Sequence, residues 1–352
     1  MLKTKAKPPL RIIHARAPIR INDLGGWTDT WFAGRGRVLN AAVEPAVEAQ
    51  AKVYERTGRG EPRVTILASN YRQTIRVDPA DAKPEPHGLL QFAVSALPPD
   101  PALRLEITLH SHVPAGISTG TSAAVTVALL GVLNALRPQP LAWTDLAGLA
   151  HKIETEKLGC QSGIQDQIAA ARGGMSYIVM DEYPKARTTS VRLSANLRAE
   201  LDRRLCLVYL GAPHRSSAIH EAVIAELERG GPQFAVLREL ADLAGEARRA
   251  LLAEDLDAYG RAMILNHEGQ RRLGPGLVST RADRAVAICR RHGAAGWKVN
   301  GAGGAGGSMT VLASPDDGCR RAMIAAVERL GGGVRIIPTR LSPLGVQAWD
   351  VL

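Results

Sequence analysis

The 352-residue sequence lacks several features that would assign it to a class directly. Aromatic residues make up only 4%, which argues against a stacking surface for single-stranded nucleic acid. No apolar run reaches the ~20 residues of a transmembrane helix, and no apolar segment follows the basic N-terminus to make a signal peptide. The four cysteines are far apart and form no Cys-x-x-Cys pair, which predicts reduced thiols rather than a zinc site or a disulfide framework. We therefore expect a cytoplasmic protein without a membrane partner.

The formal net charge is +10, but the basic residues are mostly arginines scattered along the chain in single positions or short doublets. A nucleic-acid-binding protein usually carries a clustered basic stripe. We interpret most of the charge as solvated helix faces, with a share for attracting an anionic substrate, and expect no nucleic-acid partner. A hydrophobic content of 45% at this length predicts a globular protein with two domains.

A glycine- and hydroxyl-rich loop lies between a predicted strand, Leu103–His112, and a predicted buried helix, Ala123–Leu136. A loop of this kind before a helix can bind phosphate, because the first helical amides are unpaired and the helix dipole is positive there. The same residues are also compatible with an ordinary helix cap after a Pro-Gly turn. The residues concerned are Pro114, Gly116, Ser118, Thr119, Gly120, Thr121 and Ser122.

The segment Arg16–Thr30 runs from a strand into a loop at Gly25-Gly26 and concentrates polar groups with specific chemistry. It is either a surface hairpin with solvated charges or a binding loop, and the glycine pair beside Trp27 and Asp29 favours the binding loop.

Two acidic residues follow on the next predicted helix, Leu141–Leu158, and on the turn after it. Glu154 and Asp166 are either an exposed helix charge and a cap, or a pair in which one carboxylate holds Mg²⁺ and the other orients a nucleophile.

The run Gly301-Ala-Gly-Gly-Ala-Gly-Gly307 matches a dinucleotide fingerprint literally, but the residues after it are typical of a strand rather than a helix. We interpret it as a tight loop between strands that packs against another loop or a phosphate. The alternative is an exposed flexible hairpin, which would leave the ordering entropy of so many glycines without a compensating contact.

The remaining pattern predicts an α+β protein with a boundary in the polar stretch near Arg192–Arg203. We expect domains at 1–195 and 196–352. In the first, Arg37–Val43 and Val47–Tyr54 are predicted as two strands joined by a turn at Glu44-Pro45. In the second, strands alternate with helices in a sheet of antiparallel character.

Together these segments resemble the three motifs of the GHMP small-molecule kinases, a family that includes galactokinase, homoserine kinase, mevalonate kinase and phosphomevalonate kinase. Arg16–Thr30 resembles the first motif, Pro114–Ala124 the second and Gly301–Ser308 the third, and this order spans nearly the whole chain. The resemblance implies an N-terminal domain like ribosomal protein S5, a C-terminal ferredoxin-like domain, and ATP in the cleft between them.

The resemblance also implies roles for individual residues. Gly163-Ile-Gln-Asp166-Gln looks like the galactokinase segment with the catalytic aspartate, and Ala17-Pro-Ile-Arg20-Ile-Asn like the segment whose arginine pairs with it. Mg²⁺ would be held by Ser122 and Glu154. The phosphates of ATP would lie on the second-motif loop, with Gly303 and Gly304 of the third motif supporting it. The implied substrate contacts are Arg16, Gly26, Trp27, Asp29 and Gly163.

Departures from the family pattern narrow the range of expected substrates. Gly-Gly-Trp-Thr-Asp-Thr replaces the Gly-Glu-His-Thr-Asp of galactokinases and is similar to L-fucose kinases and D-glycero-D-manno-heptose 7-phosphate kinases, although Trp31-Phe32 stands where prolines are usual. We predict an ATP- and Mg²⁺-dependent sugar kinase, a monomer or a homodimer. The alternatives are a kinase for another alcohol or a sugar phosphate, whose phosphate Arg16, His214 or Arg215 would hold, and a non-catalytic sugar sensor.

Overall fold

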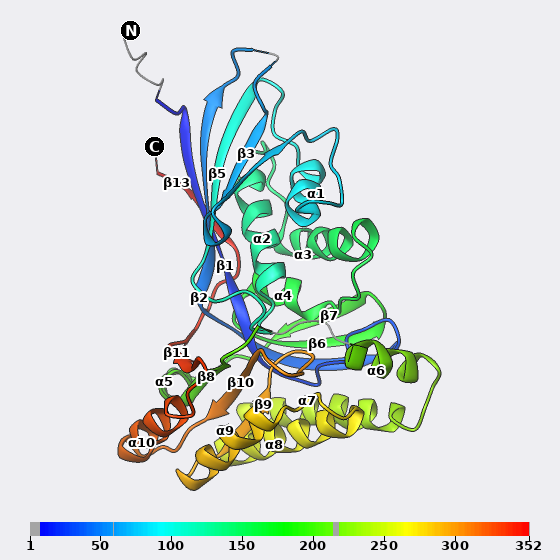
Figure 1. The fold of residues 1–352 in the computed structure, drawn as a ribbon, viewed down its shortest axis with the longest axis vertical. Coiled ribbons are helices and arrows are strands. Elements are labelled where there is room, and N and C mark those ends of the chain that lie inside the picture. The colour runs from blue at the N-terminus through cyan, green and yellow to red at the C-terminus, as the bar shows by residue number, and fades with distance from the viewer. Residues whose placement is uncertain (1–7, 59, 214–217, 352) are drawn as a thin grey trace.

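The computed structural model describes residues 8–58, 60–213 and 218–351, which form two sheets with helices packed on them (Figure 1). The first sheet has nine strands in the described chain, with the main order β13-β1-β2-β5-β3-β4; β6 and β12 also pair with β2, and β7 pairs with β6. Its strands from the first half of the chain are β1 (Arg11–Leu24), β2 (Gly36–Glu55), β3 (Val64–Ala68), β4 (Gln73–Val77), β5 (Leu103–Ser111), β6 (Met175–Glu182) and β7 (Lys185–Ser190).

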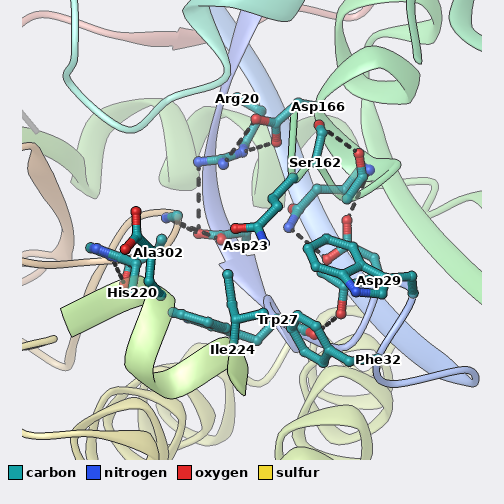
Figure 2. Close-up of a pocket in the computed structure, with 17 residues that line it drawn as sticks. Arg20, Asp23, Trp27, Asp29, Phe32, Ser162, Asp166, His220, Ile224 and Ala302 are labelled. Carbon is teal, nitrogen blue, oxygen red and sulfur yellow. Dashed lines mark hydrogen bonds and ion pairs between the residues drawn. The ribbon is translucent and has the colours of Figure 1, made fainter. Parts of the chain in front are cut away.

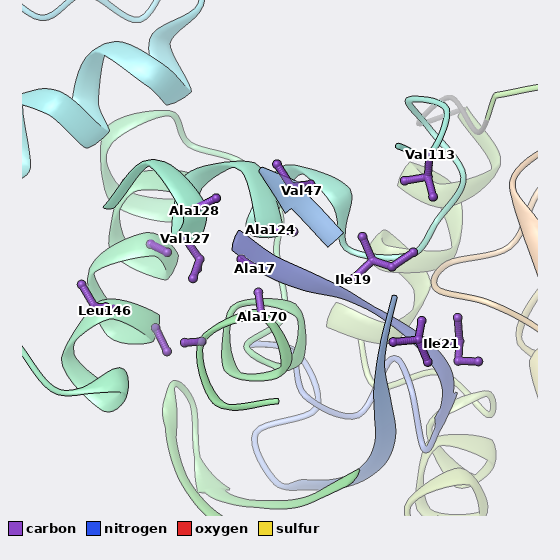
Figure 3. Packing of buried hydrophobic residues seen from close by; sticks show 14 of the residues in the cluster. Ala17, Ile19, Ile21, Val47, Val113, Ala124, Val127, Ala128, Leu146 and Ala170 are labelled. Atoms are coloured by element: carbon purple, nitrogen blue, oxygen red, sulfur yellow. The ribbon is translucent and has the colours of Figure 1, made fainter. Parts of the chain in front are cut away.

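Helices cover one side of this sheet and create the main hydrophobic core (Figure 1). The central helix is α2, whose small residues let it lie close to β1; Figure 3 shows Ala124, Val127 and Ala128 of α2 beside Ala17 and Ile19. This close packing holds the start of α2 against the end of β1. The helices are α1 (Gly88–Ala96), α2 (Thr121–Asn134), α3 (Trp143–Lys152) and α4 (Gln165–Arg172), with a 3₁₀ turn at Ser69–Tyr71.

The second sheet has the order β11-β8-β10-β9, all antiparallel, with its own apolar core. Its arrangement with helices agrees with the expected α+β fold. The elements are α5 (Ala195–Arg204), β8 (Leu205–Leu210), α6 (Ala218–Glu228), α7 (Phe234–Leu252), α8 (Leu256–Leu273), α9 (Thr280–Arg291), β9 (Gly296–Val299), β10 (Ser308–Leu312), α10 (Asp317–Glu328) and β11 (Val334–Ile337).

Two predicted elements differ in the structure. The expected hairpin at Glu44-Pro45 is one long strand, β2, with an irregularity there: its first part pairs with β6 and its last part with β5. Proline fits at this point because the ladder is interrupted between Val43 and Val47. The predicted helix Leu141–Leu158 ends at Lys152 and continues as one π-helical turn, Ile153–Lys157.

The C-terminal segment also departs from the expected division at residue 196. Strands β12 (Arg340–Leu341) and β13 (Gln347–Asp350) leave the second unit and pair with β2 and β1 of the first sheet. In the described part of the chain, every helix is too short or too polar to cross a bilayer.

Candidate active site

A cavity of about 240 Å³ opens where the end of β1, the turn before α4, helix α6 and the third-motif loop meet (Figure 2). Segments from both halves of the chain therefore line one space. The lining includes Arg20, Asp23, Trp27, Asp29, Gly163, Asp166, Glu221 and Gly301.

Arg20 and Asp166 form a two-point ion pair inside this cavity. Arg20 Nε donates to Asp166 Oδ1 at 2.7 Å and Nη2 donates to Oδ2 at 3.3 Å (Figure 2). Burial alone would lower the pKa of Arg20, but Asp166 and Asp23 outweigh it, and the net pKa is raised. The guanidinium is thus a fixed positive charge beside a carboxylate that remains part-exposed.

The second-motif loop lies directly on this pair. Arg20 N donates to Thr119 O at 2.9 Å, and Arg20 Nη1 donates to Ser118 O at 2.5 Å. A Cβ on Gly120 would fall 3.0 Å from the Asp166 Cγ and 3.1 Å from its Oδ2, and Gly120 has φ +67°. Only glycine therefore allows the backbone to approach the carboxylate in this conformation.

Gly120 is also the N-cap of α2, so no side chain of the cap residue pairs with the first amides of the helix. The structure therefore differs from the alternative interpretation of the loop, an ordinary helix cap formed by a Ser or Thr side chain. The arrangement keeps helical amides available for an anion at a point within a few ångströms of Asp166.

The third-motif loop supports the second-motif loop through Gly301 and Ser308. A Cβ on Gly301 would lie 3.1 Å from Ser118 O, and Ser308 Oγ donates to Ile117 O at 2.6 Å. Gly303 and Gly304 are placed differently: Gly304 N donates to Leu277 O at 2.7 Å, and a Cβ on Gly303 would meet the same oxygen. These two glycines thus pack on the segment after α8 and do not line the cavity.

Asp29 is buried at the opposite wall of the cavity. Its Oδ2 accepts from Gln165 N at 3.0 Å and its Oδ1 from Gln165 Nε2 at 3.3 Å. Gly163 makes room for it, because a Cβ there would fall 2.3 Å from Asp29 Oδ2. Burial raises the pKa of Asp29 to about 6, and the negative charge of Asp166 adds to the shift.

Glu154 lies in the π-helical turn, an irregularity that often marks functional sites. Its Oε2 accepts from Gln167 Nε2 at 2.7 Å and from Ser162 Oγ at 2.9 Å, while its Oε1 is buried without a hydrogen-bond partner. Burial raises the pKa of Glu154 to about 7. Ser122 is exposed on the first turn of α2, and the described residues contain no cluster of three acidic, histidine or cysteine side chains that could hold a metal alone.

Trp27 forms an apolar wall of the cavity with φ +75°, a conformation that is uncommon for a residue with a Cβ. Its ring stacks on His220 of α6 at 6.0 Å between centroids, and Phe32 lies 6.4 Å away. Gly26 holds the turn close to Asp23, since a Cβ on Gly26 would lie 2.6 Å from Asp23 Oδ2. Trp27 thus lines the cavity, whereas Gly26 lies in the same turn without lining it.

Arg16 is placed elsewhere. Its guanidinium donates to Gln347 Oε1 on β13 at 3.2 and 3.0 Å and lies near Glu44, so it contributes to strand pairing and not to the cavity. His214 and Arg215, the other residues considered for a substrate phosphate, lie outside the described residues.

The sequence reasoning missed Lys298, which reaches Asp23 from β9, and the residues of α6 that close the cavity. A lysine within the short apolar run Gly296–Val299, next to the glycine loop, was the available signal. A buried strand tolerates a lysine only when its charge is paired.

Comparisons with known proteins agree with this arrangement. Residues 89–174 match the family model "GHMP kinases N terminal domain" and residues 247–331 match "GHMP kinases C terminal". The chain is 30% identical over 255 residues to the mevalonate kinase of Pyrococcus horikoshii, covering 72% of this chain and 71% of the relative. It is 23% identical over 249 residues to the D-glycero-alpha-D-manno-heptose 7-phosphate kinase of Campylobacter jejuni, covering 70% and 72%.

Among solved structures, a D-glycero-D-manno-heptose 1-phosphate kinase from Bacteriodes thetaiotaomicron has the same fold, with a TM-score of 0.75 at 20% identity over 97% of this chain and 99% of the other. The chain belongs to the GHMP kinase family and is a phosphotransferase with an alcohol group as acceptor.

Proposed function

We propose that the chain is an ATP-dependent sugar kinase that transfers the γ-phosphoryl group to a monosaccharide hydroxyl, the anomeric one. One observation carries the proposal. The Arg20–Asp166 pair lines one cavity with the buried carboxylate of Asp29, and the glycine loop at the start of α2 lies against the pair. A phosphate donor and a polyhydroxyl acceptor can thus be bound on opposite sides of one acid–base pair.

Each residue has a role that follows from its position. The amides at Gly120 and Thr121 hold the phosphates of ATP at the positive end of α2. Asp166 accepts the hydrogen bond of the attacking hydroxyl and orients it, and Arg20 stabilises the negative charge on the group in transfer. Phosphoryl transfer depends mainly on such positioning and electrostatics.

The residues for Mg²⁺ fit the ion's preference for a few oxygen ligands together with substrate phosphates. Glu154 supplies a buried carboxylate oxygen with no other partner, and Ser122 supplies a hydroxyl on the first turn of α2. When bound, the ion neutralises charge on the phosphates. The chain's part is to keep Glu154 oriented, through the hydrogen bonds from Gln167 and Ser162.

The charges of the cavity favour an uncharged acceptor. Four carboxylates line it, and the one arginine among its described lining residues is already paired with Asp166. Lys298 compensates the charge of Asp23 and Arg20 that of Asp166, which leaves Asp29 and the exposed Glu221 to repel a second anion. Carboxylate oxygens also accept hydrogen bonds from sugar hydroxyls. A free monosaccharide, of the heptose or fucose type, therefore suits the described lining better than a sugar phosphate does. The carboxylates are Asp23, Asp29, Asp166 and Glu221.

A second candidate is an acidic alcohol such as mevalonate, which the 30% identity to a mevalonate kinase favours. The carboxylate of such a substrate would meet the negative charges of Asp29 and Glu221, which makes it the weaker candidate.

The test is a panel of acceptors assayed for ADP release with ATP and Mg²⁺: free heptoses, L-fucose, galactose, their phosphates, and mevalonate. We expect turnover with a free sugar. Turnover with a sugar phosphate or mevalonate alone contradicts the substrate proposal. ATP binding without ADP release for any acceptor would instead point to a sugar sensor.

A further inference from the structure

Asp23 and Lys298 form a completely buried ion pair between the two halves of the chain. Lys298 Nζ, on β9, donates to Asp23 Oδ1 at 2.9 Å and to Val299 O at 2.7 Å, and both side chains are 1% exposed. The amide of Gly301 donates to both oxygens of Asp23 at 3.1 Å. The pair therefore joins β1 to the root of the third-motif loop.

Arg20 lies between two carboxylates that could both attract it. Its Nη1 is 3.9 Å from Asp23 Oδ1, while its Nε and Nη2 are hydrogen-bonded to Asp166 (Figure 2). In the described residues, Arg20 and Lys298 are the cations within ion-pair distance of Asp23. The distance to Asp23 Oδ1 is 2.9 Å from Lys298 Nζ and 3.9 Å from Arg20 Nη1, so Lys298 is the nearer cation.

We propose that Lys298 is a positioning residue for phosphoryl transfer: by pairing with Asp23, it leaves Arg20 committed to Asp166 and to the phosphate loop. The proposal rests on the function proposed above, in which Arg20 acts on the group in transfer. Lys298 acts only through Asp23 and does not line the cavity itself.

The physical reason is the high energy of an unpaired charge away from water. Without the ammonium group, Asp23 keeps the Gly301 amide as its hydrogen-bond donor, and Arg20 becomes the remaining cation near it. Arg20 then moves toward Asp23 to compensate the charge. That movement breaks its bonds to Asp166 and to Ser118 O, which are the contacts that align the acid–base pair with the loop.

The test compares Lys298→Met with the double variant Asp23→Asn/Lys298→Met. A displacement of a catalytic group by about 1 Å lowers turnover by on the order of 100-fold. We therefore expect kcat of Lys298→Met to fall by about 100-fold with little change in the KM for ATP. We expect the double variant to recover at least tenfold of that loss, since it no longer has a carboxylate that competes for Arg20.

Lys185→Met is the matched control, because Lys185 makes a pair of the same 2.9 Å length with Glu182 at an exposed site. A double variant that is as slow as Lys298→Met overturns the proposal, because removal of the competing carboxylate should let Arg20 return to Asp166. A merely structural ion pair could also show rescue of folding, so the position of Arg20 in the variants is the deciding readout. Where Lys298→Met does not fold, Lys298→Gln removes the same charge and retains an amide donor.

Crystal structures of the same variants separate this inference from the proposed function, since they need no turnover. We expect Arg20 to leave Asp166 in the single variant and to return to it in the double variant. An Arg20–Asp166 pair that is intact in the single variant overturns the inference even if the wild-type chain is a sugar kinase. If the wild-type chain turns over none of the acceptors while Arg20 moves as expected in the variants, only the proposed sugar-kinase function is contradicted.

Discussion

Arg20 and Asp166 share two hydrogen bonds although 146 residues separate them in the chain. The first belongs to β1 and the second to the first turn of α4, so their alignment depends on the packing of α4 on the sheet. Because Gly120 lies against the same carboxylate, a change at any of the three positions affects the other two.

Asp166→Asn tests the acid–base assignment. The amide oxygen can still accept from Arg20, so we expect the fold and ATP binding to be retained while kcat falls by about 10³-fold, within the range of general acid–base effects. Steady-state kinetics measure kcat, and titration with ATP measures nucleotide binding. Asp242→Asn, at an exposed pair with Arg37, is the control. Near-normal turnover of Asp166→Asn would refute the assignment.

Gly120→Ala tests the close approach of the loop to Asp166. The new methyl group must occupy a left-handed conformation and contact the carboxylate, so we expect a loss of about 1–2 kcal/mol in the free energy of unfolding and a higher KM for ATP. Gly148→Ala is the matched control, since Gly148 lies in α3 with nothing within 4 Å of its Cβ position. Gly148→Ala should increase the free energy of unfolding by about 0.5–1 kcal/mol, because alanine has the higher helix propensity. Equal effects of the two substitutions would contradict the prediction.

Glu154 should make stability depend on pH. Burial raises its pKa in the folded protein to about 7 from an ordinary 4.5, so the folded state binds the proton more tightly than the unfolded state does. The associated stabilisation is fully present below the unfolded pKa and is lost as pH rises through about 7. Glu154→Gln removes this dependence. The free energy of unfolding of the variant, relative to that of wild type, should therefore increase by roughly 3 kcal/mol from acidic to mildly basic pH.

Urea unfolding at several pH values measures that gain. Glu182→Gln, at an exposed site, should follow wild type throughout. A difference between Glu154→Gln and wild type that is constant with pH would contradict the prediction. If Glu154 also holds Mg²⁺, the affinity of wild type for Mg²⁺ and ATP should rise over the same pH interval, because the ligand must be deprotonated.

Asp29→Asn tests the acceptor side of the cavity. Losing a charged acceptor for sugar hydroxyls should raise the sugar KM by about 10- to 100-fold and leave the KM for ATP unchanged. Because burial raises the pKa of Asp29 to about 6, the wild-type sugar KM should itself increase as pH falls through that value. The variant should lack this increase. An equal rise in both KM values would indicate a general disruption of the site instead.

The parts of the fold that sequence predicts well are those with a strong local pattern. The strand Leu205–Leu210 and the helix Thr280–Arg291 lie where their apolar periodicity and caps place them. The single strand β2 was missed because Pro45 is a local signal for a turn, whereas the strand continues through pairing with β5 and β6, which are distant in sequence.

The residues of the candidate site also differ in whether a local sequence pattern predicts them. Asp29 and Asp166 could be named from motifs whose residues are close in sequence, and the cavity contains both. For Lys298 the only local signal was its place in an apolar run, and its role depends on a contact with Asp23 across 275 residues. Arg16 sits four residues before Arg20, but β13 covers it, and no local pattern shows that the C-terminal strand returns there.

That return has a mechanical consequence. The polypeptide enters the second unit after β7 and comes back through β12 and β13, so two covalent crossings connect the halves. Two connections restrict how far the second unit can separate from the first sheet more than one connection would. Expression of residues 1–195 alone would leave β1 without β13, its outer neighbour, and expose a sheet edge prone to aggregation.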